Sequence, residues 1–75
     1  MSDLCKLTNE DINKNSVNTI NQFRVLAYLK SNLNIYSFEV YLYDKDTIKV
    51  IDLTGAIGYF KYDDDKKEVL FLEEL

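Results

Sequence analysis

Carboxylates are the most abundant groups in this chain that could do chemistry. The 75 residues include 13 Asp and Glu, 9 Lys and Arg, one cysteine and no histidine. Without histidine, the commonest general base near neutral pH, an acid–base site would need a carboxylate pair, a lysine or a tyrosine in a cleft. The carboxylates instead fall in expected turns, strand edges and the C-terminal segment, where solvated acids are ordinary. The sequence therefore predicts a protein that is not an enzyme.

Metal and thiol chemistry are also weakly supported. Asp63–Asp65 followed by Glu68 matches a calcium loop only in composition, because an EF-hand alternates its acids around a central glycine. The Asp44-Lys45-Asp46 triplet is common in turns. Cys5 has no histidine to activate it, and a single cysteine cannot form an intramolecular disulfide. We expect no cofactor and no metal, and the lone thiol suits a reducing cytoplasm.

The charge is distributed unevenly along the chain. The net charge is −4, made up of +1 over residues 1–38 and −5 over residues 39–75. Direct binding to nucleic acid or to an anionic membrane surface is disfavoured, because both need a concentrated basic patch. A larger protein with a basic groove would instead be attracted. The polar first segment and the lack of a long apolar run predict neither a signal peptide nor a transmembrane helix.

The first half of the chain has helical patterning. Thr8 followed by Asp11 is typical of a helix start with a capping box. Asn15 and Ser16 predict a break, after which the main helix runs over residues 16–32. Its core stripe is expected to consist of Val17, Ile20, Phe23 and Ala27.

The second half changes to alternating patterning. Strands are predicted over residues 36–43, 47–53, 56–62 and 68–73, joined by short turns that include Thr54-Gly55. Short connections between successive strands indicate an antiparallel meander. The predicted fold is α+β: an N-terminal helix, broken near Asn15, packed on a four-stranded antiparallel sheet. We expect one domain over 1–75, with a lead-in over 1–7, helix over 8–33 and sheet over 35–73.

Turn lengths predict the strand register and therefore the two faces of the sheet. Val40 should pair with Val50, Val50 with Tyr59, and Tyr59 with Phe71, with a bulge near Ile51 or Gly58. The helix should cover the face that carries Val40, Leu42, Ile48, Val50, Tyr59 and Phe71. The opposite face should carry Tyr41, Ile51, Phe60, Leu70 and Leu72, mixed with Glu39, Lys49 and Tyr62.

One helix cannot cover both faces of a sheet, so the second apolar face indicates an interaction surface. We expect partner binding through this face and its acidic rim, at Glu39, Tyr41, Tyr43, Ile51, Phe60, Tyr62, Asp63, Asp64, Asp65, Leu70 and Leu72. The predicted function is a small acidic protein-binding regulator or inhibitor that occludes a surface of a larger partner.

A small, acidic, cofactor-free chain of this kind is similar in size and composition to small phage or mobile-element inhibitors, including inhibitors of CRISPR effectors. That analogy rests on size and composition alone. The alternative is a homodimeric structural or interaction module that uses the same uncovered face, since oligomerisation commonly stabilises chains below about 80 residues.

Overall fold

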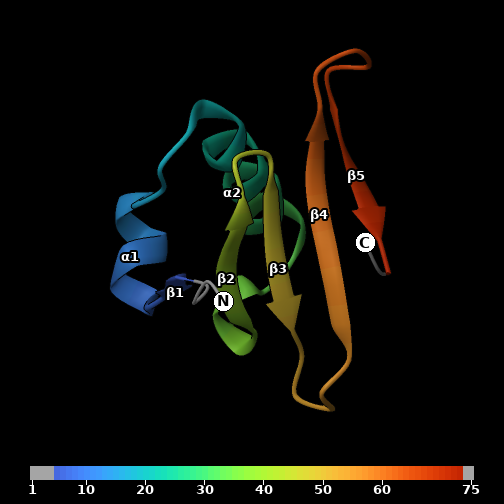
Figure 1. Ribbon diagram of the computed structural model, residues 1–75. Coiled ribbons are helices and arrows are strands. Elements are labelled where there is room, and N and C mark those ends of the chain that lie inside the picture. Colours follow the sequence, from blue (N-terminus) through green and yellow to red (C-terminus); the bar gives the residue numbers. More distant parts are fainter. Residues whose placement is uncertain (1–4, 74–75) are drawn as a thin grey trace.

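The computed structural model describes residues 5–73, which form two helices and a five-stranded antiparallel sheet. The strands follow chain order across the sheet, and Figure 1 shows the helices on one side of it. The elements are β1 (Cys5–Leu7), α1 (Asn9–Lys14), α2 (Ile20–Asn32), the 3₁₀ turn η1 (Ile35–Ser37), β2 (Glu39–Asp44), β3 (Thr47–Ile51), β4 (Ile57–Asp63) and β5 (Glu68–Leu72).

The α+β class is confirmed, but the strand count and the position of the helix are corrected. The sheet has five strands rather than four, because Cys5–Leu7 pairs antiparallel with β2. The main helix is therefore not the first element of the chain. Residues 5–7 belong to the sheet instead of a lead-in, whereas residues 1–4 lie outside the described residues. Leu7 lies opposite Val40 and is buried, which explains why so short a strand forms.

Both helices begin at the polar signals that the local sequence supplies. Thr8 caps α1 through a full capping box with Asp11, as expected. Asn15 then ends α1 in the left-handed conformation, so the predicted break is confirmed. The second cap is Thr19 rather than Ser16, and its capping-box partner is Gln22.

The buried stripe of α2 differs from the predicted one. Ile20, Phe23 and Ala27 are exposed, and the sheet side of the helix consists of Gln22, Val25, Leu26 and Leu29. Gln22 explains the difference. Its Oε1 accepts from the backbone N–H groups of Asn18 and Thr19 at 2.8 and 3.2 Å, and its Nε2 donates to the Asp44 carbonyl at 2.6 Å. These bonds turn Gln22 inward, which rotates Phe23 outward.

The β2–β3 pairing agrees with the predicted register. Val40 lies opposite Val50, and Leu42 lies opposite Ile48. The ladder shifts between Leu42 and Asp44, so the irregularity falls at Tyr43. The predicted bulge near Ile51 or Gly58 is wrong, since β3 and β4 pair regularly from Thr47–Lys61 to Ile51–Ile57.

The connection from β3 to β4 overturns the predicted face of β4. It runs from Asp52 to Ala56 and is held by Asp52, whose Oδ1 accepts from the N–H groups of Thr54 and Ala56 at 2.8 and 3.0 Å. Gly55 has the expected positive φ of 90°. This wider loop pairs Val50 with Gly58 instead of Tyr59. Because side chains alternate along a strand, a one-residue slip exchanges the faces of the whole strand.

The last hairpin contains a second one-residue slip that cancels the first. Phe60 rather than Tyr59 pairs with Phe71, after a turn from Asp64 to Lys67. Phe71 therefore lies on the helix side, and Leu70 and Leu72 lie on the opposite side, both as predicted.

The core lies between α2 and the sheet, and α1 and η1 complete it. Every member is at most 6% exposed: Leu7, Ile12, Val25, Leu26, Leu29, Ile35, Val40, Leu42, Ile48 and Val50. Phe38, Phe60, Tyr62 and Val69 are partly buried against this cluster. Among the described residues, no helix is long and apolar enough to cross a membrane.

Thr47 and Thr19 should respond oppositely to replacement by valine. Thr47 is fully buried, and its hydroxyl has no hydrogen-bond partner among residues 5–73. Thr47→Val should therefore raise the free energy of unfolding by about 1 kcal/mol, because it removes an unsatisfied buried polar group.

Thr19→Val is the matched control. The Thr19 hydroxyl accepts from the Gln22 N–H at 3.0 Å and donates to the Lys45 carbonyl. Its loss should lower the free energy of unfolding by about 1–2 kcal/mol. Urea denaturation of both variants measures the two changes, and equal destabilisation by both would contradict the assignment of an unpaired Thr47 hydroxyl.

Candidate functional site

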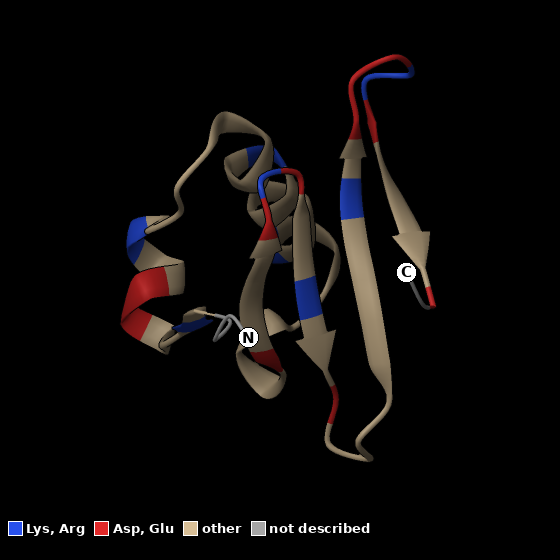
Figure 2. Cartoon of the chain, in the orientation of Figure 1, with Lys and Arg blue, Asp and Glu red and all other residues tan. Residues whose placement is uncertain are grey.

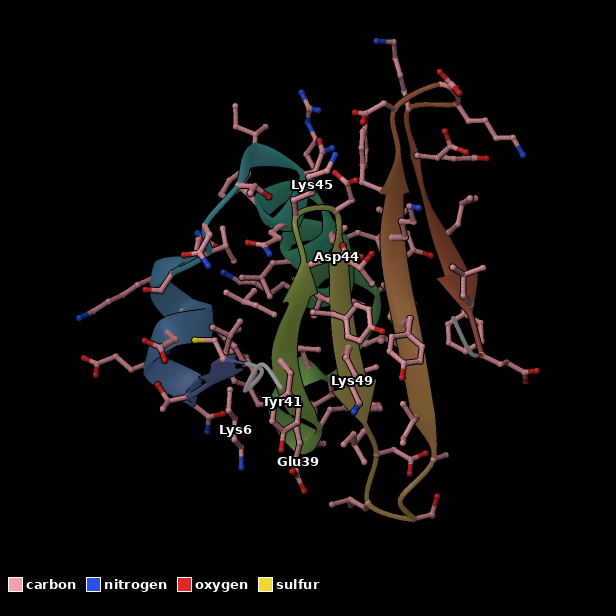
Figure 3. The ribbon with its side chains drawn as sticks, in the orientation of Figure 1. Lys6, Glu39, Tyr41, Asp44, Lys45 and Lys49 are labelled. Atoms are coloured by element: carbon pink, nitrogen blue, oxygen red, sulfur yellow. The ribbon has the colours of Figure 1, made fainter. Side chains whose placement is uncertain are left out.

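The sheet face turned away from α1 and α2, here called the open face, carries a row of alternating aromatic and cationic residues. Lys6, Tyr41, Lys49 and Tyr59 lie directly opposite one another on β1 to β4, and Leu72 of β5 ends the row. Figure 3 shows Lys6, Tyr41 and Lys49 side by side on the viewer's side of the sheet. Ile51 and Ile57 form an adjacent apolar pair. The row thus crosses the full width of the sheet.

Polar contacts hold one end of this row. The Tyr41 hydroxyl donates to Glu39 Oε1 at 2.8 Å, and Lys6 Nζ lies 3.8 Å from the same oxygen. Lys49 Nζ lies 5.8 Å from the centre of the Tyr41 ring. The hydrogen bond to Glu39 raises the pKa of Tyr41 above its ordinary value of 10.0, because the carboxylate holds the proton of the phenol. Tyr41 is therefore a neutral ring with a fixed orientation.

A tyrosine pair occupies the centre of the open face. Tyr43 and Tyr59 meet edge to face, with ring centres 5.0 Å apart and an angle of 70° between their planes. The irregularity at the end of β2 places Tyr43 beside Tyr59 of β4. Tyrosines offer large, rigid contact areas with a polar tip, which is the composition of many protein interfaces.

The structure divides the predicted binding residues into three groups. Glu39, Tyr41, Tyr43, Ile51, Leu70 and Leu72 lie on the open face, where they were expected. Phe60 and Tyr62 lie on the helix side. Phe60 packs 6.3 Å from the Tyr28 ring, and Tyr62 lies under the Arg24 guanidinium at 5.0 Å. Asp63, Asp64 and Asp65 lie at the β4–β5 turn.

Tyr59 and Lys61 are two of the open-face residues that sequence reasoning placed elsewhere or omitted. Both belong to β4, whose face depends on the length of the Asp52–Ala56 loop. The Asp52 side chain was the available signal, because an aspartate at the start of a loop commonly accepts bonds from backbone N–H groups further along.

Six of the acidic residues, those of segments 44–46 and 63–68, lie together at one end of the sheet rather than over the open face. Figure 2 shows them at the β2–β3 and β4–β5 turns, near the start of α2. Segments 44–46 and 63–68 contain six acids and three lysines, a net charge of −3. The open face instead carries three lysines, Lys6, Lys49 and Lys61, and one acid, Glu39. The sheet therefore has an acidic end next to a weakly basic open face.

Asn21 joins the two acidic turns to α2. Its Nδ2 donates to Asp46 Oδ1 at 2.7 Å and to both carboxylate oxygens of Asp64 at 3.2 Å. The hydrogen bond from Asn21 lowers the pKa of Asp46 below its ordinary value of 3.8. This contact orients two turns that are distant in sequence.

An apolar groove of about 220 Å³ lies on the helix side of the sheet. Its walls include Leu33, Phe38, Val50, Gly58, Phe60 and Phe71. The Phe71 ring covers Gly58 so closely that a Cβ at position 58 would lie 2.6 Å from Phe71 Cε1. Phe71 itself is 56% exposed. Asp52 also lines the groove, but its Oδ1 accepts from the backbone N–H groups of Thr54 and Ala56, so most of the lining offers apolar contact.

Comparison of the chain with protein-family models, curated proteins and solved structures finds no match. In residues 5–73, no three acidic or cysteine side chains are grouped so that they could hold a metal ion.

Asn21→Ala should raise the pKa of Asp46 toward 3.8, because it removes the donor that stabilises the charged carboxylate. A folded-state pKa below the unfolded value means that the contact stabilises the fold above the unfolded pKa and loses this effect as pH falls through the folded pKa. Unfolding free energy should therefore depend less on pH below about 4 in the variant. Carboxyl-detected NMR titration measures the pKa directly. Asn34→Ala is the control, since Asn34 bonds Ser37 and no acid; an equal shift there would contradict the mechanism.

Proposed function

We propose that this chain is a small non-enzymatic protein-binding regulator that acts by covering a surface of a larger protein. The open face is the contact surface in this proposal. The observation that carries it is the set of Tyr41, Tyr43 and Tyr59 on a face that neither α1 nor α2 covers. Ile51, Ile57, Leu70 and Leu72 supply adjoining apolar area.

The composition of the open face supports protein binding over other partners. Its aromatic centre and apolar flank are typical of interface hot spots, and its few charged groups are spaced among them. Its three lysines are few for a nucleic-acid surface, and the neighbouring acidic turns would repel phosphates. Tyr41 is already oriented by Glu39, so binding would restrict it little further.

The acidic end of the sheet favours a partner that has a basic surface. Carboxylates at the two turns would attract a basic surface and speed its association. A partner with a basic groove, such as a nucleic-acid-directed enzyme, fits this arrangement, and a phage or mobile-element inhibitor in the cytoplasm is the biological setting we propose. The alternative is self-association through the open face, which the same tyrosines and leucines favour.

Tyrosine substitutions on the open face test the contact surface. The double variant Tyr41→Ser, Tyr59→Ser should remain folded, because neither residue belongs to the buried core. It should lose partner binding by a factor of about a hundred, as two interface tyrosines would. Titration calorimetry against a partner identified by crosslinking the wild-type chain measures the loss.

Tyr36→Ser is the matched control for this experiment. Tyr36 is 42% exposed but belongs to η1, outside the sheet. The proposal requires that this variant bind as the wild type does. Equal loss of binding in the control variant, or full binding by the double variant, would contradict the open face as the contact surface.

Salt should weaken the association if the acidic turns steer it. Raising the salt concentration from about 50 to 300 mM shortens the screening length and should slow association several-fold. Stopped-flow mixing measures the rate. The variant Asp63→Asn, Asp64→Asn, Asp65→Asn should associate slowly at both salt levels, and a salt-independent wild-type rate would rule out steering.

A further inference from the structure

β5 is an edge strand whose outer side has no partner within residues 5–73. Its central residues, Val69 to Leu72, are all apolar, and the strand pairs regularly with β4 along its whole length. Exposed edges of this kind are normally protected by a lysine, a proline, a bulge or a short length. β1, the opposite edge, is protected in this way, with three residues and Lys6 at its centre. β5 has no lysine, proline or bulge, and its one charged residue, Glu68, lies at its first position.

Both faces of β5 carry apolar side chains. Val69 and Phe71 lie on the helix side, and Leu70 and Leu72 lie on the open face. Phe71 remains 56% exposed, although it contacts Phe60 with ring centres 5.0 Å apart. A strand added beside β5 would cover apolar groups on both faces at once.

The charges that flank β5 identify a second copy of the same strand as its partner. Lys67 precedes the strand, and Glu73 follows it. An antiparallel copy reverses direction, so the lysine of each chain meets the glutamate of the other. A two-fold axis perpendicular to the sheet requires one residue to lie opposite itself, because side chains on each face must match.

Leu70 is the residue that satisfies these conditions. With Leu70 opposite the second copy's Leu70, Val69 faces Phe71 twice, and Lys67, in the turn just before the strand, comes level with Glu73 twice. Glu68 then lies opposite Leu72 at each end of the pairing, where its exposed carboxylate stays in water. A shift toward the start of the strand would place Asp65 opposite Glu73, and a shift toward its end would place Val69 opposite Glu73. Both alternatives lose the two Lys67–Glu73 pairs, and the first also sets like charges opposite each other.

We propose that two copies of this chain pair antiparallel through β5, with Leu70 at the two-fold axis, to form one continuous ten-stranded sheet. The helix-side Phe60 and Phe71 of each copy then join in one apolar layer. The open faces of the two copies lie side by side on the other side of the sheet. This edge contact differs from self-association through the open face and does not depend on the proposed function.

A disulfide test reads the register directly. Residues directly opposite in an antiparallel pair have Cα atoms about 4.5–5.5 Å apart, within the range that a disulfide spans. In a Cys5→Ser background, Leu70→Cys should form a covalent dimer rapidly under mild oxidation. Leu53→Cys is the control, because Leu53 is 90% exposed in the β3–β4 loop, far from this edge. Equal or faster crosslinking of the control, or no crosslink at position 70, would overturn the proposal.

A charge-exchange series tests the flanking pairs without touching the apolar strand. Lys67→Glu should raise the dimer dissociation constant about tenfold or more, because two attractive contacts become repulsive. Adding Glu73→Lys to this variant should restore the wild-type constant. Light scattering and sedimentation equilibrium over a range of concentrations provide both values, with circular dichroism to check folding. A wild-type chain that stays monomeric at every concentration, or no rescue by the double variant, would overturn the proposal.

If dimerisation fails while the open-face tyrosine variants still lose partner binding, only the edge contact is wrong. If the dimer forms but the tyrosine variants bind the partner as the wild type does, the edge contact is supported and the proposed function is wrong.

Discussion

A single short helix can cover only one face of a five-stranded sheet, and the rest of this structure depends on that limit. α2 has 13 residues and is about 20 Å long, while the five strands span about 19 Å from axis to axis. Its buried stripe meets Val40, Ile48 and Val50, and the core forms there. The opposite face has no helix available, so its apolar and aromatic groups remain at the surface.

Gln22 determines where this one helix sits. A buried side-chain amide without hydrogen-bond partners would lower the stability of the fold, whereas an exposed one would bond water. The three hydrogen bonds of Gln22 therefore constrain both the rotation and the position of α2. The bond to the Asp44 carbonyl fixes the start of α2 against the end of β2. Asn21, one residue earlier, then holds the acidic turns through Asp46 and Asp64. Adjacent residues at the start of α2 thus organise both the core and the acidic end.

The separation of surfaces has a consequence for binding. Net charge alone describes an acidic protein, but the structure places six of the acids together at one end of the sheet and interleaves lysines with tyrosines on the open face. In the proposed function, charge at the turns would act over a distance and influence how fast a partner arrives. Tyr41, Tyr43 and Tyr59 would act at contact and influence how long the partner stays. The proposal thus assigns the two roles to different parts of the same sheet.

Local signals in the sequence were sufficient for much of the fold. The capping box at Thr8, the break at Asn15, the change to alternating pattern and the β2–β3 register all follow from neighbouring residues. They predicted the α+β class and placed Glu39, Tyr41 and Ile51 on the open face. Such features depend on contacts a few residues apart, which is why sequence alone determines them. Leu70 and Leu72 also lie on the predicted face, but only because two one-residue register slips cancel.

Tertiary structure decided the faces of α2 and β4 and the fifth strand. The inward turn of Gln22 depends on the Asp44 carbonyl, 22 residues away. The faces of β4 depend on a loop that Asp52 widens by hydrogen bonds no hydrophobic pattern reveals. Cys5–Leu7 is too short for periodicity to indicate a strand and forms only because the edge of β2 is there to pair with it. In each case a contact distant in sequence, or a single hydrogen-bonded side chain, outweighed the local pattern.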